Sequence, residues 1–219
     1  NIDVANIKAL AEKWFGPIPS GTKYTRNLPV EPKQTTPRQL EVKSGVPLDA
    51  LYKCWHIYSR RDKRYYISDL ITDILSGGGS SRLFQSLVKE QKLFSSIECY
   101  HLGSHDPGLL VIEGKLVKGI LMKDAEQAIE NEILKLCQHG VSNEELEKVK
   151  NKTESAMAFE DMGLMNRASS LAIYELLGDA NLINSELDTY QSVTTDEIQS
   201  LSQIIFNTEN CSTLYYYAK

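Results

Sequence analysis

The chain has 219 residues and a net charge of −5, with 42% hydrophobic and 24% charged residues. This length and composition are ordinary for one or two globular domains with a proper core. The acidic balance and the absence of a dense Lys/Arg run argue against a nucleic-acid surface, and no apolar stretch approaches the roughly 20 residues that cross a bilayer. We therefore expect neither nucleic acid nor a membrane as a partner.

The first part of the chain predicts a short helix followed by a linker. Asp3 is placed to cap a helix whose apolar residues recur at helical spacing up to Phe15, and Gly16-Pro17 ends it. Five of the seven prolines fall within 17–37. Because proline fixes φ and removes a backbone donor, this segment predicts an extended linker. The main domain is then expected over 38–219.

The rest of the chain predicts strands, then a run of helices, then a last strand. That order is typical of an α+β domain rather than an α/β domain. Helix starts are signalled by Ser142-x-x-Glu145 and Thr194-x-x-Glu197, which have the spacing of capping boxes. The expected strands are at 40–42, 51–58, 94–102, 109–116 and 213–218, and the expected helices are at 66–75, 81–90, 124–138 and 164–177, with two more that begin at the capping boxes.

Three consecutive glycines separate the expected helices at 66–75 and 81–90. Glycine reaches positive φ at no steric cost, so Gly77-Gly78-Gly79 predicts a tight or mobile joint between them. A phosphate-binding nest is the alternative interpretation. It is disfavoured because the run lacks the G-x-x-x-x-G-K-[ST] spacing, does not follow a strand, and has Arg82 as its only nearby cation.

The stretch from Leu75 to Leu87 reads L-S-G-G-G-S-S-R-L-F-Q-S-L. It resembles the Gly-rich block of the pitrilysin, insulinase and mitochondrial processing peptidase family of zinc proteases, which reads roughly L-G-G-G-x-S-S-R-L-F-Q-x-L-R-x-x-x-G-L-x-Y. The order of the expected elements and the turns at Gly140 and Gly178 are also similar to the repeated domain of that family. The resemblance implies an α+β, processing-peptidase-like metallohydrolase domain, with a mostly antiparallel sheet covered by helices on one face.

The resemblance also implies a role. The chain would be the C-terminal, non-metal half of a zinc metalloendopeptidase, in which two similar domains form a clamshell around a peptide chamber. This half would close the chamber and contact the peptide substrate through the Gly-rich loop, which comprises Gly77, Gly78, Gly79, Ser80 and Ser81. The partner would be the N-terminal metal-binding half, which carries the zinc and the general base. We expect this fragment alone to be inactive and to hold no metal; a homodimer is a further option.

The two ends of the first segment fit the same resemblance. In this family the last strand of a domain is followed by a short turn and an amphipathic helix that ends F-G-x-I-P. Asn1-Ile2-Asp3 and Trp14-Phe15-Gly16-Pro17-Ile18-Pro19 are similar to that tail. We therefore expect 1–16 to be the closing helix of a preceding domain that is missing from this sequence.

The zinc motif of the family, H-x-x-E-H, places two histidines on one helix face, and its glutamate activates the zinc-bound water. Only His101 and His105 have that spacing here, and Ser104 stands where the glutamate would be. The stretch predicts strand and loop rather than helix. We interpret the pair as solvated histidines in a surface turn, with an independent metal site as the alternative. A G-x-S-x-G elbow for Ser-His-Asp chemistry is also absent.

Several members of the family use an Arg and a Tyr, seven residues apart beyond the Gly-rich block, to hold the scissile peptide at the zinc site. Alignment on the block puts Val88 and Ser95 at these positions. Neither side chain can supply the hydrogen bonds of a guanidinium and a phenol. Lys89, Lys92 or Phe94 would substitute only if the register shifted. The loss favours a second hypothesis, a non-catalytic assembly or core-type subunit of the same family.

The four cysteines are Cys54, Cys99, Cys137 and Cys211, and no two form a C-x-x-C pair. We interpret them as buried free thiols in a reducing compartment rather than as two disulfides. The expected location is therefore the cytoplasm.

Overall fold

A computed structural model describes residues 3–22, 29, 31–103 and 105–219. The chain forms two compact units, Asn1–Pro32 and Lys33–Lys219. In the first unit, the Asp3 carboxylate caps α1 (Val4–Phe15) by accepting from the Ala5 N–H at 3.0 Å, as predicted. No helix or strand occurs at the described residues between α1 and β1. The assignment of 1–16 to a preceding domain stays a prediction.

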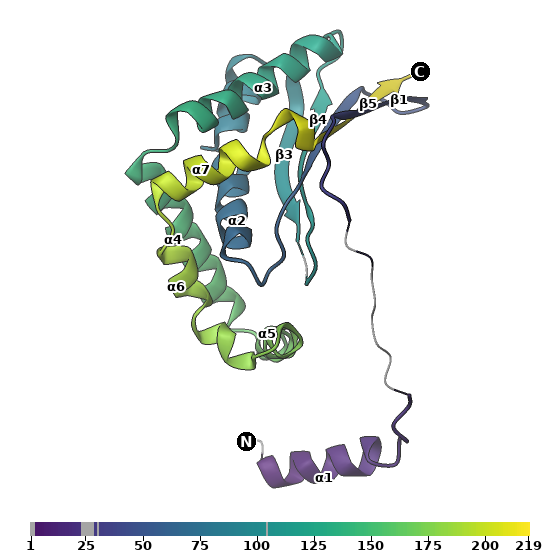
Figure 1. Ribbon diagram of the computed structural model, residues 1–219, viewed down its shortest axis with the longest axis vertical. Helices are drawn as coiled ribbons and strands as arrows, with labels where there is room; N and C mark the ends of the chain where they lie inside the picture. Colours follow the sequence, from purple (N-terminus) through teal and green to yellow (C-terminus); the bar gives the residue numbers. More distant parts are fainter. Residues whose placement is uncertain (1–2, 23–28, 30, 104) are drawn as a thin grey trace. The chain divides into compact units, whose positions relative to one another are not determined.

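The second unit is built on a five-stranded sheet with the order β1-β5-β2-β4-β3. The hairpin of β3 (Phe94–Leu102) and β4 (Leu109–Leu116) forms one side, with β2 (Ala50–His56) next to it. The last strand, β5 (Cys211–Ala218), inserts between β2 and β1 (Arg38–Ser44). Only the β1–β5 pair is parallel, so the sheet is mostly antiparallel. The two ends of this unit thus meet in the sheet (Figure 1).

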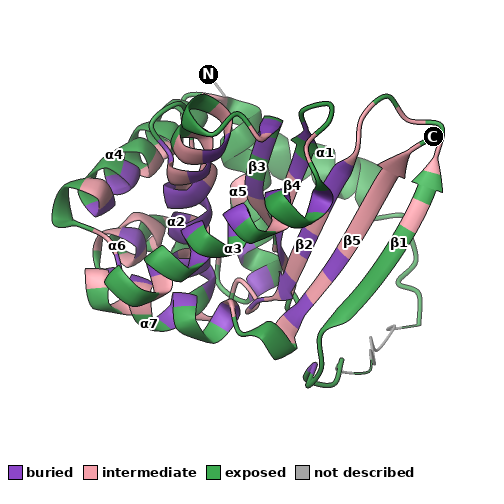
Figure 2. Cartoon of the chain, turned by 90° about the horizontal axis from the view of Figure 1, so that it is seen from above, coloured by how far each residue is buried: buried purple, intermediate pink, exposed green. Residues whose placement is uncertain are grey.

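Helices cover one face of this sheet, and the strands alternate accordingly. In β2, Leu51, Lys53 and Trp55 are buried, whereas Tyr52 and Cys54 on the opposite face are only partly covered. This period of two is what a half-buried sheet requires. The buried faces of α2, α3 and α7 contribute to one hydrophobic core with the sheet (Figure 2). The predicted α+β class and one-sided helix layer are confirmed.

The remaining elements follow from local signals in the sequence. The helix-ending glycine Gly140 has a φ of 62°, and Thr194 and Glu197 form the complete predicted capping box. The bounds of these elements are α2 Lys63–Ser76, η1 Phe84–Glu90, α3 Met122–His139, α4 Asn143–Glu160, α5 Leu164–Leu177, η2 Ala180–Asn184, α6 Glu186–Gln191, α7 Thr195–Ile205 and η3 Thr208–Asn210.

Three features differ from the expectations. The helix after the glycines is a π-helix, η1, rather than an α-helix. At the start of α4, Ser142 accepts from the Glu145 N–H, but the Glu145 carboxylate binds Arg82 instead of completing the capping box. Gln34, within the expected linker, is buried, and its amide nitrogen donates to the Cys211 carbonyl at 2.8 Å.

All four cysteines are free thiols; Cys99 and Cys211 are buried, as expected, whereas Cys54 and Cys137 are only partly covered. Among the described residues, none of the helices combines the length and the apolar character that a membrane crossing requires.

Candidate functional site

The Gly-rich loop joins the C-terminus of α2 to η1. Gly77 ends α2 by donating its N–H to the Asp73 carbonyl at 2.7 Å. One residue earlier, the Ser76 hydroxyl accepts from the Cys99 N–H at 2.6 Å and donates to the Cys99 carbonyl at 3.2 Å. The end of α2 is therefore attached to the edge strand β3. The loop thus begins at a helix end that is fixed to the sheet.

The two exposed glycines of the loop have different backbone requirements. Gly78 has a φ of 132°, a conformation that residues with a Cβ rarely adopt. Gly79 has no positive φ, and a Cβ added there would meet nothing within 4 Å. Gly78 is thus required by the path of the chain, whereas Gly79 is not required for any steric reason.

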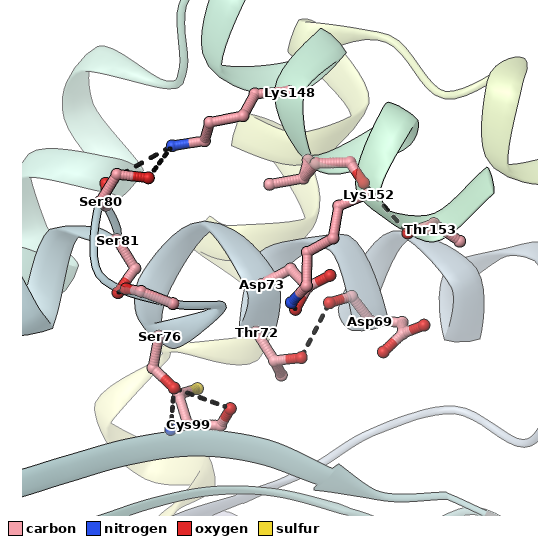
Figure 3. A network of polar contacts seen from close by, with 12 residues as sticks. Asp69, Thr72, Asp73, Ser76, Ser80, Ser81, Cys99, Lys148, Lys152 and Thr153 are labelled. Atoms are coloured by element: carbon pink, nitrogen blue, oxygen red, sulfur yellow. Dashed lines mark hydrogen bonds and ion pairs between the residues drawn. The ribbon is translucent and has the colours of Figure 1, made fainter. Parts of the chain in front are cut away.

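The loop presents backbone rather than side chains. Gly78, Gly79 and Ser80 are exposed, but Ser81 is buried and its hydroxyl donates to the Gly78 carbonyl at 2.6 Å. Figure 3 shows Lys148 of α4 reaching the loop, where its ammonium group lies 3.3 Å from the Ser80 hydroxyl. Of the five residues predicted to bind substrate, Gly78, Gly79 and Ser80 are accessible, and Ser81 instead closes the turn.

Arg82 holds the start of η1 against α4. Its guanidinium donates to both carboxylate oxygens of Glu145, at 2.9 and 2.6 Å, and to the Gly140 carbonyl at 2.9 Å. Both side chains are about four-fifths buried, with exposed fractions of 21% and 19%. A bidentate Arg–carboxylate pair of this kind fixes geometry as well as contributing energy. The arginine of the S-S-R-L-F-Q motif therefore has a structural role in this chain.

The positions at which the family places its Arg and Tyr do not converge on the loop as a polar pair. Val88 is half-buried and packs against the hydrophobic core. Ser95 lies at the β-bulge of β3, where its hydroxyl donates to the Lys115 carbonyl at 3.1 Å. Lys92, which aligns with the glycine of the family block, is the only described non-glycine residue with positive φ, at 54°. The loss of this glycine leaves a strained lysine.

A polar cluster that the sequence did not predict lies beside the loop, between α2, β3, α4 and α6. Asp69 and Asp73 are four residues apart on α2, the spacing of the two histidines in H-x-x-E-H, with Thr72 in place of the glutamate. Lys152 of α4, which lies next to Asp73 in Figure 3, pairs with that carboxylate at 2.7 Å. Tyr190 of α6 donates to Asp69 at 2.5 Å. The i, i+4 pair of acids on α2 was the signal that could have revealed this cluster.

His101 belongs to this cluster, so its interpretation as a solvated turn residue is wrong. It lies in β3 with 15% of its side chain exposed, and its Nδ1 lies 3.0 Å from an Asp69 carboxylate oxygen. Its Nε2 lies 2.9 Å from the Tyr65 hydroxyl. His105 is exposed, as expected, and Ser104 lies outside the described residues. The two histidines do not meet.

The pKa values of the two carboxyls on α2, Asp69 and Asp73, shift in opposite directions. Burial opposes the ionisation of Asp69, but hydrogen bonds from His101 and Tyr190 outweigh it and lower the pKa of that carboxyl. Burial raises the pKa of Asp73, and the nearby Lys152 only partly offsets this. Compared with a carboxyl group in water, the cluster therefore favours the ionised form of Asp69 and disfavours that of Asp73.

These side chains do not fit a zinc ion. The Lys152 ammonium group pairs with Asp73, and the Asp69 carboxylate already contacts Tyr190 and His101. Over residues 3–22, 29, 31–103 and 105–219, no three His, Cys, Asp or Glu side chains gather in a way that could hold a metal. Zinc needs three or four such ligands free to coordinate. No chemistry of this domain is therefore assigned to a metal.

Comparison with known proteins agrees with the fold and the loop. The zinc protease YmxG of Bacillus subtilis, itself described as uncharacterized, is 25% identical over 207 residues, which cover 94% of this chain and 49% of that protein. The crystal structure of a protease from Helicobacter pylori has a TM-score of 0.91 at 18% identity, and the match covers 98% of this chain and 53% of that one. A peptidase M16 inactive domain from Pseudomonas fluorescens has a TM-score of 0.81 at 15% identity, covering 100% of this chain and 52% of that one.

At these identities the solved structures establish the fold alone, and the chain spans about half the length of these relatives. The family itself is established by sequence. The model of the Peptidase M16 inactive domain family matches residues 1–153, which include the Gly-rich loop and most of α4. This chain belongs to the Peptidase M16 inactive domain family.

Proposed function

We propose that this domain closes a peptide chamber against a metal-bearing half of the same protein and contacts the substrate peptide through the exposed backbone of Gly78–Ser80. The loop supports this role because its anchors are buried and its two tip glycines, Gly78 and Gly79, are exposed. Ser81 and Arg82 fix one side of it, and the Ser76–Cys99 bonds fix the other. An extended peptide can pair with exposed backbone groups whatever its side chains, and the two glycines, which lack side chains, permit close approach.

Zinc and the general base belong, in this proposal, to the other half of the protein, which we place N-terminal to this domain. The donor set of this domain supports that division, because its α2 acids are engaged by Lys152, His101 and Tyr190. The domain alone would then cleave no peptide and bind no stoichiometric zinc. The four free cysteines support a reducing compartment, and we propose the cytoplasm.

The test compares two glycines in the full-length protein. Gly79 and Gly45 are both exposed, lack positive φ and have open space where a Cβ would be placed, but only Gly79 lies in the loop. Gly79→Ala should lower peptide turnover, with little change in the free energy of unfolding. Gly45→Ala, the matched control, should leave both unchanged. Unaltered turnover in a stable Gly79→Ala protein would remove the loop from substrate binding.

A second function, a non-catalytic assembly subunit, is favoured by one observation. Val88 packs into the core and Ser95 bonds the backbone, so neither can hold a scissile peptide. If the full-length protein binds peptides but hydrolyses none, even with zinc supplied, this second function replaces the first. Hydrolysis that depends on the metal-bearing half supports the proposal above.

A further inference from the structure

Helix α5 is apolar on the side that faces away from its own domain. Leu164, Ala168, Ala172 and Leu176 recur every four residues and are exposed, so they form one ridge along the helix. Leu164 and Leu176 retain 80% and 75% of their accessible surface. Soluble domains place isolated leucines on the surface, but an uninterrupted apolar ridge on a helix usually has a partner.

Three more exposed apolar side chains come from the end of α4, the turn after it and the first turn of α5. Phe159, Met162 and Met165 are 74%, 77% and 77% exposed. We call these three residues, together with Leu164 and Leu176, the α5 patch. Several large apolar side chains that are exposed on neighbouring turns are typical of an interaction site. Methionine adds flexible, polarisable contacts that adapt to an opposing surface.

The opposite side of α5 holds it only weakly to its own domain. Of its 14 residues, only Tyr174 and Leu177 are buried. The Tyr174 hydroxyl accepts from Arg60 at 3.0 Å, and Arg60 in turn pairs with Glu186 at 2.7 Å. Most of the stability of a protein helix comes from packing of its apolar face. A helix with only two buried residues and an exposed apolar ridge therefore indicates a permanently bound partner.

We propose that the α5 patch is the surface on which this domain docks against the metal-bearing half of the same protein, an inference that rests on the proposed function. About half of each relative's length lies outside the match with this chain. That length supplies a covalently linked partner of similar size at high effective concentration. The small Ala168 and Ala172 at the middle of the ridge let an apolar helix or strand of that half approach closely.

Methionine oxidation tests the docking in the full-length protein, because oxidation of a thioether depends on its exposure. The chain has four methionines, of which Met122 is buried and Met162 and Met165 are exposed in this domain. With dilute hydrogen peroxide and mass spectrometry, Met162 and Met165 should oxidise at least about tenfold more slowly than in the urea-unfolded protein, as the buried Met122 does. Leu134→Met supplies the control, because Leu134 of α3 is 51% exposed and lies outside the patch; a methionine there should oxidise freely.

Free oxidation of Met162 and Met165 in the folded full-length protein would overturn the docking. Protection that is lost on dilution to a monomer would overturn it in favour of a second copy, and protection that requires added peptide would overturn it in favour of substrate. Peptidase activity is measured on the same samples. If Met162 and Met165 are protected but the protein is inactive, the docking proposal stands and the proposed function is wrong. If the protein is active but both methionines oxidise freely, the proposed function stands and the docking proposal is wrong.

Discussion

Gly78 and Gly79 are adjacent glycines that should respond oppositely to alanine. A Cβ at either would meet nothing within 4 Å, so steric clashes with neighbours contribute nothing to the difference. Gly78→Ala retains the φ of 132° only with backbone strain of about 1–3 kcal/mol. Alanine offsets about 0.4–1 kcal/mol of this by restricting the unfolded chain. The net loss in the free energy of unfolding is about 1–2 kcal/mol, which lowers the melting temperature by about 3–6 °C in a domain of this size.

Gly79→Ala restricts the unfolded chain without straining the folded one, so it should leave stability unchanged or raise it by up to about 1 kcal/mol. Urea unfolding followed by circular dichroism measures both variants, and equal m-values confirm that the unfolding reaction is the same. If Gly79→Ala costs as much as Gly78→Ala, backbone conformation does not explain the glycine run. Unchanged stability in Gly78→Ala would refute the reasoning directly.

Three further substitutions test the surroundings of the loop by urea unfolding. Lys92→Gly relieves a positive φ and should raise the free energy of unfolding by about 0.5–1 kcal/mol; a loss would contradict the strain. Arg82→Lys removes the bidentate pair with Glu145 and should cost about 1–2 kcal/mol, whereas a neutral result would deny its structural role. Because the pKa of Asp69 is lowered, its contribution is present above the unfolded pKa of about 3.9 and is lost as the pH falls through the folded value. Asp69→Asn should therefore cost about 1–3 kcal/mol at neutral pH, and the gap should narrow as the pH falls below the unfolded pKa if the contacts with His101 and Tyr190 are the cause.

Elements whose ends are marked by local sequence signals were predictable from the sequence. β3, β4 and α5 have the predicted bounds; each is an apolar run, and Gly103 and Gly178 directly follow β3 and α5. Thr194 and Glu197 likewise carry their own start signal for α7. The loop itself was predicted because three consecutive glycines between two apolar segments are typical of a joint between helices.

Contacts that depend on the order of strands were not predictable. His101 seemed solvated because its neighbours in sequence form a turn, whereas its partners come from α2. Lys53 lies in an apolar strand and is 4% exposed, yet it is satisfied by Glu126 and Glu130 of α3 at 2.6 and 3.0 Å. A buried charge needs such partners. Only the packing of α3 on the sheet reveals where they are.

The polar cluster on α2 bears on why an inactive domain retains a Gly-rich loop. Asp69 and Asp73 have the spacing that a metal helix uses, but His101 and Tyr190 contact the Asp69 carboxylate and Lys152 pairs with Asp73. Removing Lys152 would leave the Asp73 carboxylate largely buried with no cation paired to it, so the cluster is coupled to folding rather than open to a ligand. The loop next to it keeps two exposed glycines on a base that is fixed by hydrogen bonds. Binding surface without metal chemistry is what a domain needs if its task is to hold a peptide that another half cuts.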